Sequence, residues 1–141
     1  MTSEFAVAVH GLVYLNKKKT TISSEELASS VCTNPARIRK VMAKLKKAGI
    51  IATKEGLEGG YHFIKAPDQV NLKQICDALE VTFVSSSWKS GDENIPCMIS
   101  SGMSGVMDDI YGELNELCRN RMEKITIQDI QEKLIKSQSG S

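Results

Sequence analysis

The segment from Asn34 to Gly49 constrains the fold of this chain more than any other part of its sequence. Asn34 can cap a helix, and Pro35 suits the first helical position because its missing N–H leaves no bond unmade there. Gly49 follows where such a helix would end. Between these limits, apolar side chains recur at the spacing of one helix face: Ile38, Val41, Met42 and Leu45. The segment therefore predicts an amphipathic helix with one buried face.

The other face of this predicted helix carries charge of one sign. Between residues 37 and 47 there are six basic side chains and no acidic one: Arg37, Arg39, Lys40, Lys44, Lys46 and Lys47. Surface helices commonly mix signs, because opposite charges three or four residues apart attract each other. A face of one sign suits a polyanion, since phosphates that Lys and Arg neutralise release their counterions. We expect this face to meet nucleic acid; the alternative is a solvated basic surface.

The elements predicted around this helix set the fold class. A helix is expected over residues 4–15, and a second over 24–30 begins with a capping box at Ser23. Two β-prone runs, 50–54 and 61–65, flank a glycine-rich turn and predict a hairpin. Helix, short helix, tight turn, helix and hairpin is the order of a winged helix-turn-helix. The expected class is therefore mainly α with a small β-hairpin.

The second half of the chain predicts a long helix. Residues 72–79 form a short amphipathic pattern, residues 83–96 suit a loop, and a long helical pattern runs from Cys97 to about Lys124. A last helix is expected over residues 126–135. The long pattern carries an apolar stripe with steps of four and three, as in a coiled coil: Met103, Met107, Ile110, Leu114 and Leu117. A small head cannot cover so long a stripe, so we expect it to pair two chains as a homodimer.

Charge is divided between the two halves of the chain. Residues 1–65 hold 11 Lys and Arg against 5 Glu, and residues 66–141 hold 7 against 12 acids, giving net charges of +6 and −5. A basic half fits contact with a polyanion. The expected organisation is a DNA-binding domain over 1–82, a loop over 83–96, a dimerisation helix and terminal helix over 97–136, and a disordered tail over 137–141.

Several classes of protein are excluded by what the sequence lacks. No apolar run approaches the roughly 18 residues that cross a bilayer, and the N-terminus has no features of a signal peptide. Four widely spaced cysteines fit free thiols in a reducing compartment better than a disulfide scaffold. No nucleophile has a base nearby in sequence, and His10 and His62 lack partners at ligand spacing. We therefore expect a cytoplasmic protein without membrane contact, metal or cofactor, and not an enzyme.

Four blocks of sequence carry a resemblance to a known family: Thr33–Pro35, Leu45–Ile51, Gly59–Tyr61 and Lys124–Ile130. They are similar to the Rrf-type-two family of bacterial winged-helix regulators, which includes the iron–sulfur cluster regulator and the cysteine-metabolism repressor. The likeness covers nearly the whole chain and is most specific from Leu45 to Tyr61. It implies a dimer formed through the long helix and a signal sensed through cysteines or a bound cluster.

The expected DNA contacts combine the recognition helix with the wing. They are Asn34, Pro35, Ala36, Arg37, Arg39, Lys40, Lys44, Gly59, Gly60 and Tyr61. The wing departs from the family pattern, in which an Arg often precedes the first glycine. This chain has Glu55 there and Glu58 nearby, and phosphates repel carboxylates. Contact between this wing and the minor groove is therefore in doubt, and the wing can instead pack through its two glycines and Tyr61.

The cysteines differ from those of cluster-binding members, which carry three closely spaced cysteines before the long helix. Here residues 85–97 hold Cys97 alone, and a cluster needs about four ligands. We expect no cluster unless a dimer assembles the ligands. Cys32 precedes the recognition helix and Cys97 begins the long one, and a helix N-terminus lowers a thiol pKa. The family architecture suggests that Cys32 pairs with Cys97 of the partner subunit on oxidation, the alternative being two ordinary small residues. Cys76 and Cys118 lie on apolar faces and are expected to be buried.

Together these features predict a dimeric winged-helix repressor that binds a palindromic operator in double-stranded DNA and senses redox state through cysteines. Two other functions remain open. The acidic wing would suit a module that binds protein, and a salt-sensitive shift of duplex DNA would separate the two. The dimer interface could also hold a small-molecule ligand, which titration of Trp88 fluorescence could reveal.

Overall fold

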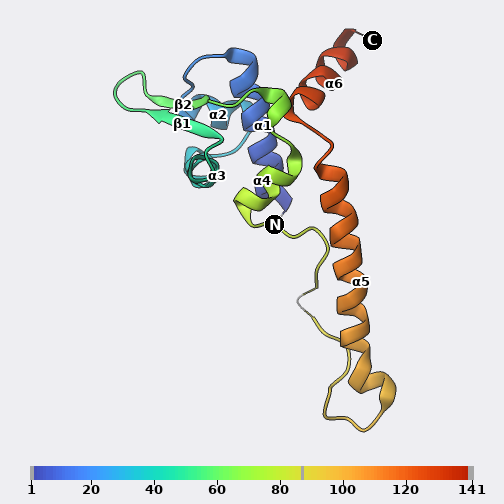
Figure 1. Cartoon of the computed structure of the whole chain (residues 1–141). Coiled ribbons are helices and arrows are strands. Elements are labelled where there is room, and N and C mark those ends of the chain that lie inside the picture. Colours follow the sequence, from blue (N-terminus) through green and yellow to red (C-terminus); the bar gives the residue numbers. More distant parts are fainter. Residues whose placement is uncertain (1, 87, 140–141) are drawn as a thin grey trace.

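The computed structural model describes residues 2–86 and 88–139, and its elements follow the predicted order (Figure 1). They are α1 (Thr2–Lys18), α2 (Ser24–Val31), α3 (Pro35–Lys47), β1 (Ile51–Lys54), β2 (Gly60–Phe63), the 3-10 helix η1 (Pro67–Gln69), α4 (Leu72–Leu79), α5 (Met98–Met122) and α6 (Ile127–Ser139). The expected class, mainly α with one small hairpin, is confirmed. α1 to α4 and the hairpin pack together as a head, from which α5 extends as an arm (Figure 1). Within these described ranges, no helix is both long and apolar enough to cross a membrane.

The core of the head lies where α1, α3 and α4 meet. Its fully buried side chains include Leu12, Ile38, Met42, Leu45 and Ile75. Met42 of α3 packs directly over Gly11 of α1, where an added Cβ atom would lie 2.6 Å from the Met42 Cε atom. The two helices therefore approach closely, and this packing fixes which face of α3 points outward.

The hairpin forms the wing. β1 and β2 are antiparallel, with Ile51 opposite Phe63 and Lys54 opposite Gly60. Ile22, just before α2, pairs with Tyr61 of β2 through two backbone hydrogen bonds of 2.8 and 2.9 Å. This third short stretch fastens the wing to the connection between α1 and α2.

Two helices run beyond their predicted ends. α1 continues through Lys18, although the polar run at residues 16–19 predicts a break after Leu15. Lysine is a good helix former, and the helix ends only at Lys19, whose φ is 56°. α6 continues to Ser139, so the predicted disorder is wrong for residues 137–139, where helix propagates from the packed first turns. Residues 140 and 141 lie outside the described residues.

α6 packs on the head and does not extend the arm. The sequence pattern groups this terminal helix with the dimerisation helix, over residues 97–136. The N–H of Ile127 donates to the carbonyl of Val70 at 3.0 Å, and that of Leu72 donates to Ile125 at 2.9 Å. Ile127 is fully buried in the core of the head, and the Asn16 side chain at the end of α1 donates to Gln131 of α6. The head therefore includes a helix from the far end of the sequence.

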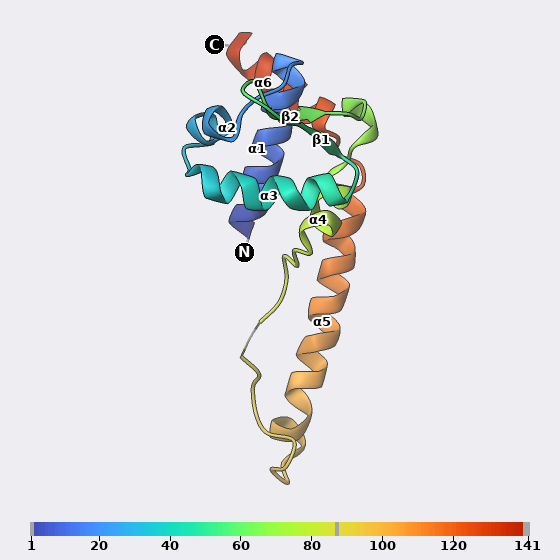
Figure 2. The same ribbon diagram turned by 90° about the vertical axis from the view of Figure 1, so that its left-hand side faces the viewer.

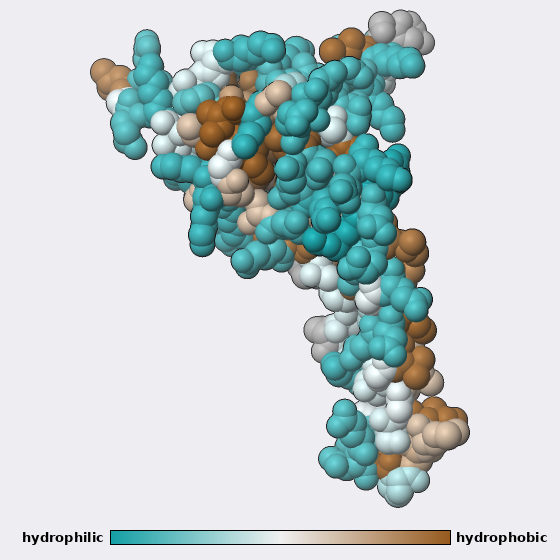
Figure 3. Space-filling view, viewed as in Figure 1, coloured by the Kyte–Doolittle hydropathy of each residue, from teal (hydrophilic) through white to brown (hydrophobic). Residues whose placement is uncertain are grey.

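α5 has two faces with different surroundings. On one face, the Asn115 side chain accepts from the Val84 N–H at 2.9 Å and donates to the Val84 carbonyl at 2.6 Å. Arg119 on the same side donates to Asp77 of α4 at 2.6 Å. The apolar stripe is left open along the arm, with exposed fractions of 36%, 42%, 42% and 65% at Met103, Ile110, Leu114 and Leu117, while Met107 is half-buried. Figure 3 shows hydrophobic surface following one side of the arm.

Candidate nucleic-acid interface

α3 lies across one side of the head (Figure 2). Most of its basic side chains are exposed. The Oδ1 atom of Asn34 accepts a 2.8 Å hydrogen bond from the Arg37 N–H, which confirms the predicted cap. Ile38 and Leu45 have no exposed surface, and neither do the other two residues of the apolar face. Because an α-helix repeats every 3.6 residues, burying this face turns the basic residues toward solvent.

The exposed fractions along α3 agree with an outward binding face. Exposed side chains belong to Ala36, Arg39, Lys40, Lys46 and Lys47, and half-buried ones to Pro35, Arg37 and Lys44. Asn34 is exposed as well, but its side-chain oxygen already serves the helix cap. The basic side chains of the segment can therefore reach an external polyanion. The side-chain oxygen of Asn34 is instead bonded to the backbone of α3.

Three of these basic side chains have partners inside the chain. Lys40 and Lys44 lie 3.4 and 3.1 Å from the carboxylate oxygens of Glu4 on α1. Arg39 donates to the hydroxyl of Ser24 at 3.2 Å. The hydrogen bond from Lys44 lowers the pKa of Glu4 more than partial burial raises it. No local sequence pattern relates Glu4 to these lysines, because only the fold brings them near each other.

The two wing glycines serve packing within the chain. At Gly60, where φ is 154°, an added Cβ atom would lie 2.2 Å from the carbonyl oxygen of Ile22. At Gly59 it would lie 2.5 Å from the carbonyl oxygen of Lys54. The backbone of Tyr61 is bonded to Ile22. All three wing residues therefore have a structural role here, while their contact with DNA stays a prediction.

The tip of the wing is exposed and acidic. Glu55, Leu57 and Glu58 all face solvent, and Leu57 is completely exposed. Phosphates repel the two carboxylates, so the tip of the wing adds no positive charge to the basic surface of α3.

This fold and its basic helix match a known family over most of the chain. The model of the Rrf2 family, described as "Iron-dependent Transcriptional regulator", matches residues 1–133. The chain belongs to the Rrf2 family. It is 26% identical over 133 residues to YwnA of Bacillus subtilis strain 168, named as an HTH-type transcriptional regulator, covering 92% of this chain and 96% of YwnA. The resemblance drawn from the sequence is confirmed, and the family and this relative are transcriptional regulators, not enzymes.

Solved structures share the Rrf2 fold. A transcriptional regulator from Lactobacillus plantarum superposes with a TM-score of 0.83 at 27% identity, covering 95% of this chain and 91% of that one. CymR of B. subtilis, described as the global cysteine regulator, gives a TM-score of 0.68 at 14% identity, covering 94% and 95%. At that identity CymR supports the shared fold alone.

Iron, which the Rrf2 family description names, has no fitting site in a single copy of this chain. An iron–sulfur cluster takes about four ligands. Across residues 2–86 and 88–139, no three Cys, His, Asp or Glu side chains are grouped so that they could hold a metal ion. The four cysteines are all free thiols. The donor set of one chain therefore does not fit the group.

The two cysteines of the redox hypothesis are both exposed. Cys97 is the N-cap of α5, and the backbone N–H groups of Ser100 and Ile99 lower its pKa, as a helix N-terminus should. Cys32 is instead the C-cap of α2, with φ at 64°. Cys32 thus lies in the turn before α3, as the sequence predicts, but the N-terminus of α3 itself is capped by Asn34.

The other two cysteines differ in burial. Cys76 is buried, as expected, and its thiol donates to the carbonyl of Val81 at 2.9 Å. Burial raises the pKa of the Cys76 thiol, which disfavours its reactive thiolate. Cys118 is only half-buried, because it lies near the edge of the α4–α5 contact.

Proposed function

We propose that this Rrf2 protein is a cytoplasmic homodimeric repressor that binds a palindromic DNA operator and responds to oxidation of Cys32 and Cys97. Each head would place α3 in the major groove, with Arg37 and Lys40 toward base edges. Arg39 and Lys44 would lie near phosphates. Two heads related by a two-fold axis would meet two half-sites one helical turn, or a multiple of it, apart.

The outward basic face of α3 is the observation on which this proposal rests. The opposite face is fully buried, so the helix cannot turn without opening the core. Lys40 and Lys44 share the partly buried Glu4, and Arg39 bonds only a hydroxyl, but all three basic side chains reach solvent, which weakens their hold on these partners. Phosphates can therefore replace Glu4 as the partner of the lysines at little cost.

The open stripe on α5 supports the dimer. It runs along an arm whose own chain packs on a different face, through Asn115 and Arg119. A row of exposed apolar side chains at coiled-coil spacing is more stable when a second such row covers it. A second copy of the same helix supplies that row, and the two-fold relation it creates suits a palindromic site.

The redox step needs two chains. Cys97 begins α5, whereas Arg119, near its other end, contacts the head, and 25 helical residues span about 37 Å. Cys32 in the head of one chain would thus pair with Cys97 of the partner subunit. Hydrogen peroxide would take two electrons and two protons from the two thiols, giving one disulfide and two waters. The lowered pKa of Cys97 makes its thiolate the attacking group.

A duplex enriched from a random-sequence library tests DNA binding. Fluorescence anisotropy against salt concentration should give an affinity that falls steeply as salt rises. Arg37→Ala and Lys40→Ala should each weaken binding by about 1 to 3 kcal/mol, and Lys44→Ala should reduce the salt slope by about one. Lys133→Ala, which removes an exposed charge from α6, is the matched control and should change little. Binding that ignores salt, or that is equally weak in all four variants, would contradict the proposal.

A second function is favoured by the wing. Leu57 is fully exposed between Glu55 and Glu58, a combination that suits a basic apolar groove on a protein partner. If the library yields no enriched duplex, binding of a protein through this tip becomes the better explanation of the exposed surface.

A further inference from the structure

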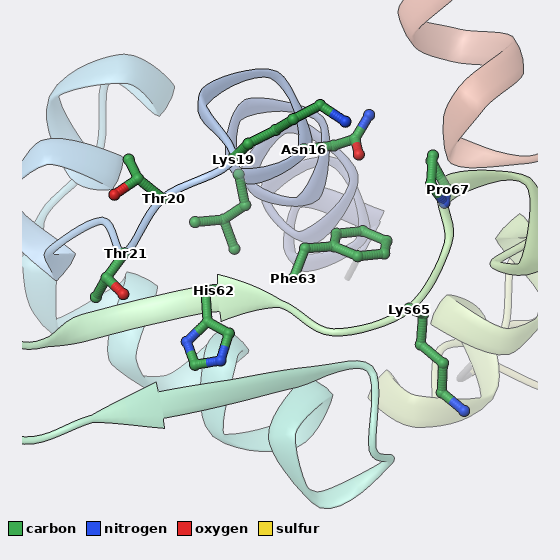
Figure 4. Close-up of a pocket in the computed structure, with 9 residues that line it drawn as sticks. Asn16, Lys19, Thr20, Thr21, His62, Phe63, Lys65 and Pro67 are labelled. Atoms are coloured by element: carbon green, nitrogen blue, oxygen red, sulfur yellow. The ribbon is translucent and has the colours of Figure 1, made fainter.

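Two cavities of the chain differ in whether their side chains converge. The larger, of about 450 Å³, lies between the end of α1 and β2, but its two lysines, Lys19 and Lys65, extend away from each other on opposite sides of β2 (Figure 4). The smaller, of about 140 Å³, lies where α5 meets α4 and the segment that follows α4. Small organic ligands usually occupy about 300 to 1,000 Å³, so the smaller cavity suits an ion instead.

One wall of this small cavity is a single face of α5. Asn115, Cys118 and Met122 line it at the spacing of neighbours on one side of a helix. Asn115 is bonded to the backbone of the segment after α4, and Arg119 donates to Asp77 of α4 at 2.6 Å. These contacts hold this face against α4, so Cys118 is directed toward the head and not along the open apolar stripe.

Cys76 of α4 lines the same cavity from the other side. Its thiol donates to the carbonyl of Val81, another lining residue, at 2.9 Å. Burial raises the pKa of Cys76 most, and the charges of Asp77 and of a Cys118 thiolate raise it further. An effect of one charge on another weakens with distance, so the thiols of Cys76 and Cys118 lie close to each other.

Three sulfur atoms therefore meet at one cavity, two from the thiols of Cys76 and Cys118 and one from the thioether of Met122. Thiolate and thioether sulfur select soft ions such as Cu(I). Structural zinc sites take about four ligands, and among the described residues no third Cys, His, Asp or Glu completes a site with the two thiols. Cu(I) needs fewer ligands than zinc, so this donor set fits Cu(I) better.

The surroundings of the sulfur atoms suit such an ion. Two thiolates and one Cu(I) ion together carry a single negative charge, and the guanidinium of Arg119, which it shares with Asp77, lines the cavity. Apolar side chains form much of the remaining wall, among them Phe83, and Met122 is buried. Phe83 is held by an edge-to-face contact with Phe5 of α1, at 5.0 Å between ring centroids. Little water therefore reaches the sulfur atoms.

We propose that Cys76, Cys118 and Met122 bind one Cu(I) ion between α4 and α5. Each thiol would lose its proton to water as its sulfur binds the ion, whereas the thioether has no proton to lose. Because α4 belongs to the head and α5 forms the arm, the ion would link the two. The inference rests on this cavity and stands whether or not α3 binds DNA.

Anaerobic titration of the reduced, full-length protein with Cu(I), in competition with the chelator bathocuproine disulfonate, tests the site. The double variant Cys32→Ser/Cys97→Ser keeps only the two thiols of the proposed site and should take one Cu(I) per chain from the chelator. In this background, Cys118→Ser should weaken binding about a hundredfold and Met122→Leu about tenfold, since a neutral thioether holds the ion less strongly than a thiolate. Met103→Leu replaces a methionine of the exposed stripe and should change nothing.

X-ray absorption at the copper edge separates ligation by Met122 from support through packing. The double variant should show sulfur ligands alone, and Met122→Leu should show one sulfur fewer. Loss of all Cu(I) to the chelator in the double variant, equal binding in Cys118→Ser, or an unchanged sulfur count in Met122→Leu would overturn the proposal. Cys118 is only half-buried, so its serine variant should fold, and thermal melting confirms this.

Discussion

Glu4 on α1 and Lys44 on α3 form an ion pair in which the carboxylate Oε2 and the amino Nζ atoms are 3.1 Å apart. Lys40 is 3.4 Å from the other carboxylate oxygen. An internal acid thus neutralises two lysines of the proposed DNA surface. Glu4→Gln should raise affinity for DNA about threefold, because phosphates then meet two unpaired lysines. Anisotropy measures the change, and Glu123→Gln, which frees Lys73 of α4 instead of a lysine of α3, should leave affinity unaltered.

The same pair gives a pH dependence of stability. The pKa of Glu4 is lowered in the fold, chiefly by the hydrogen bond from Lys44, so its charged form stabilises the native state above the ordinary value of 4.5. That contribution is lost as pH falls through the lowered value. The difference in urea midpoint between the wild type and Glu4→Gln should therefore be present at neutral pH and vanish in acid. A difference that does not change with pH would contradict this assignment.

Features encoded within a few residues were predictable from the sequence. Asn34 caps α3 and Pro35 begins it, as the local pattern predicts. The capping box is formed only in part. The Ser23 hydroxyl accepts from the Glu26 N–H, but the Glu26 carboxylate accepts from Tyr14 of α1 at 2.7 Å. Tertiary packing thus supplied a competing donor that no local pattern contains.

Features that join distant residues were beyond the sequence patterns. The polar surface of α6 gave no sign that its Ile127 enters the core of the head. In the sequence, Glu4 is an ordinary acid in the first turn of a helix, where the helix dipole stabilises a negative charge. Only the packing of Met42 over Gly11 brings α1 near enough to α3 for that acid to meet the basic face. The helix could therefore be predicted, and its internal counter-charge could not.

Gly60 tests whether the wing glycines act through packing. An alanine there would place its Cβ 2.2 Å from the Ile22 carbonyl oxygen, at a φ that side chains disfavour. Gly60→Ala should lower the free energy of unfolding by about 2 to 3 kcal/mol. Gly112→Ala on α5 is the control, in which the free energy of unfolding should change in the opposite direction. Nothing lies within 4 Å of its Cβ position, and it should stabilise the helix by about 1 kcal/mol. Unchanged stability in Gly60→Ala with loss of DNA binding would instead favour direct DNA contact by the wing.

Leu114 tests the dimer. It belongs to the apolar stripe and is 42% exposed in the single chain, so a charge there costs the monomer little. Leu114→Glu should raise the dimer dissociation constant about a thousandfold, because two unpaired carboxylates would be buried in the interface. Sedimentation velocity measures the loss, and circular dichroism should show an intact head. Asn120→Glu adds the same charge on the polar side of α5 and should remain dimeric. A dimer that persists in Leu114→Glu would place the interface elsewhere.

Cys32 and Cys97 give a prediction that separates a specific disulfide from general oxidation. The wild type treated with hydrogen peroxide should run as a covalent dimer on a non-reducing gel, and Cys118→Ser should do the same. Each of Cys32→Ser and Cys97→Ser should lose the Cys32–Cys97 bond, because both subunits of such a dimer lack the same sulfur atom. Mixing these two variants before oxidation should restore a covalent dimer, since each mixed pair keeps one Cys32 and one Cys97 on opposite subunits. A covalent dimer of Cys32→Ser alone, with no gain on mixing, would mean that Cys97 pairs with its own copy. In that case oxidation would not link the arm to the head.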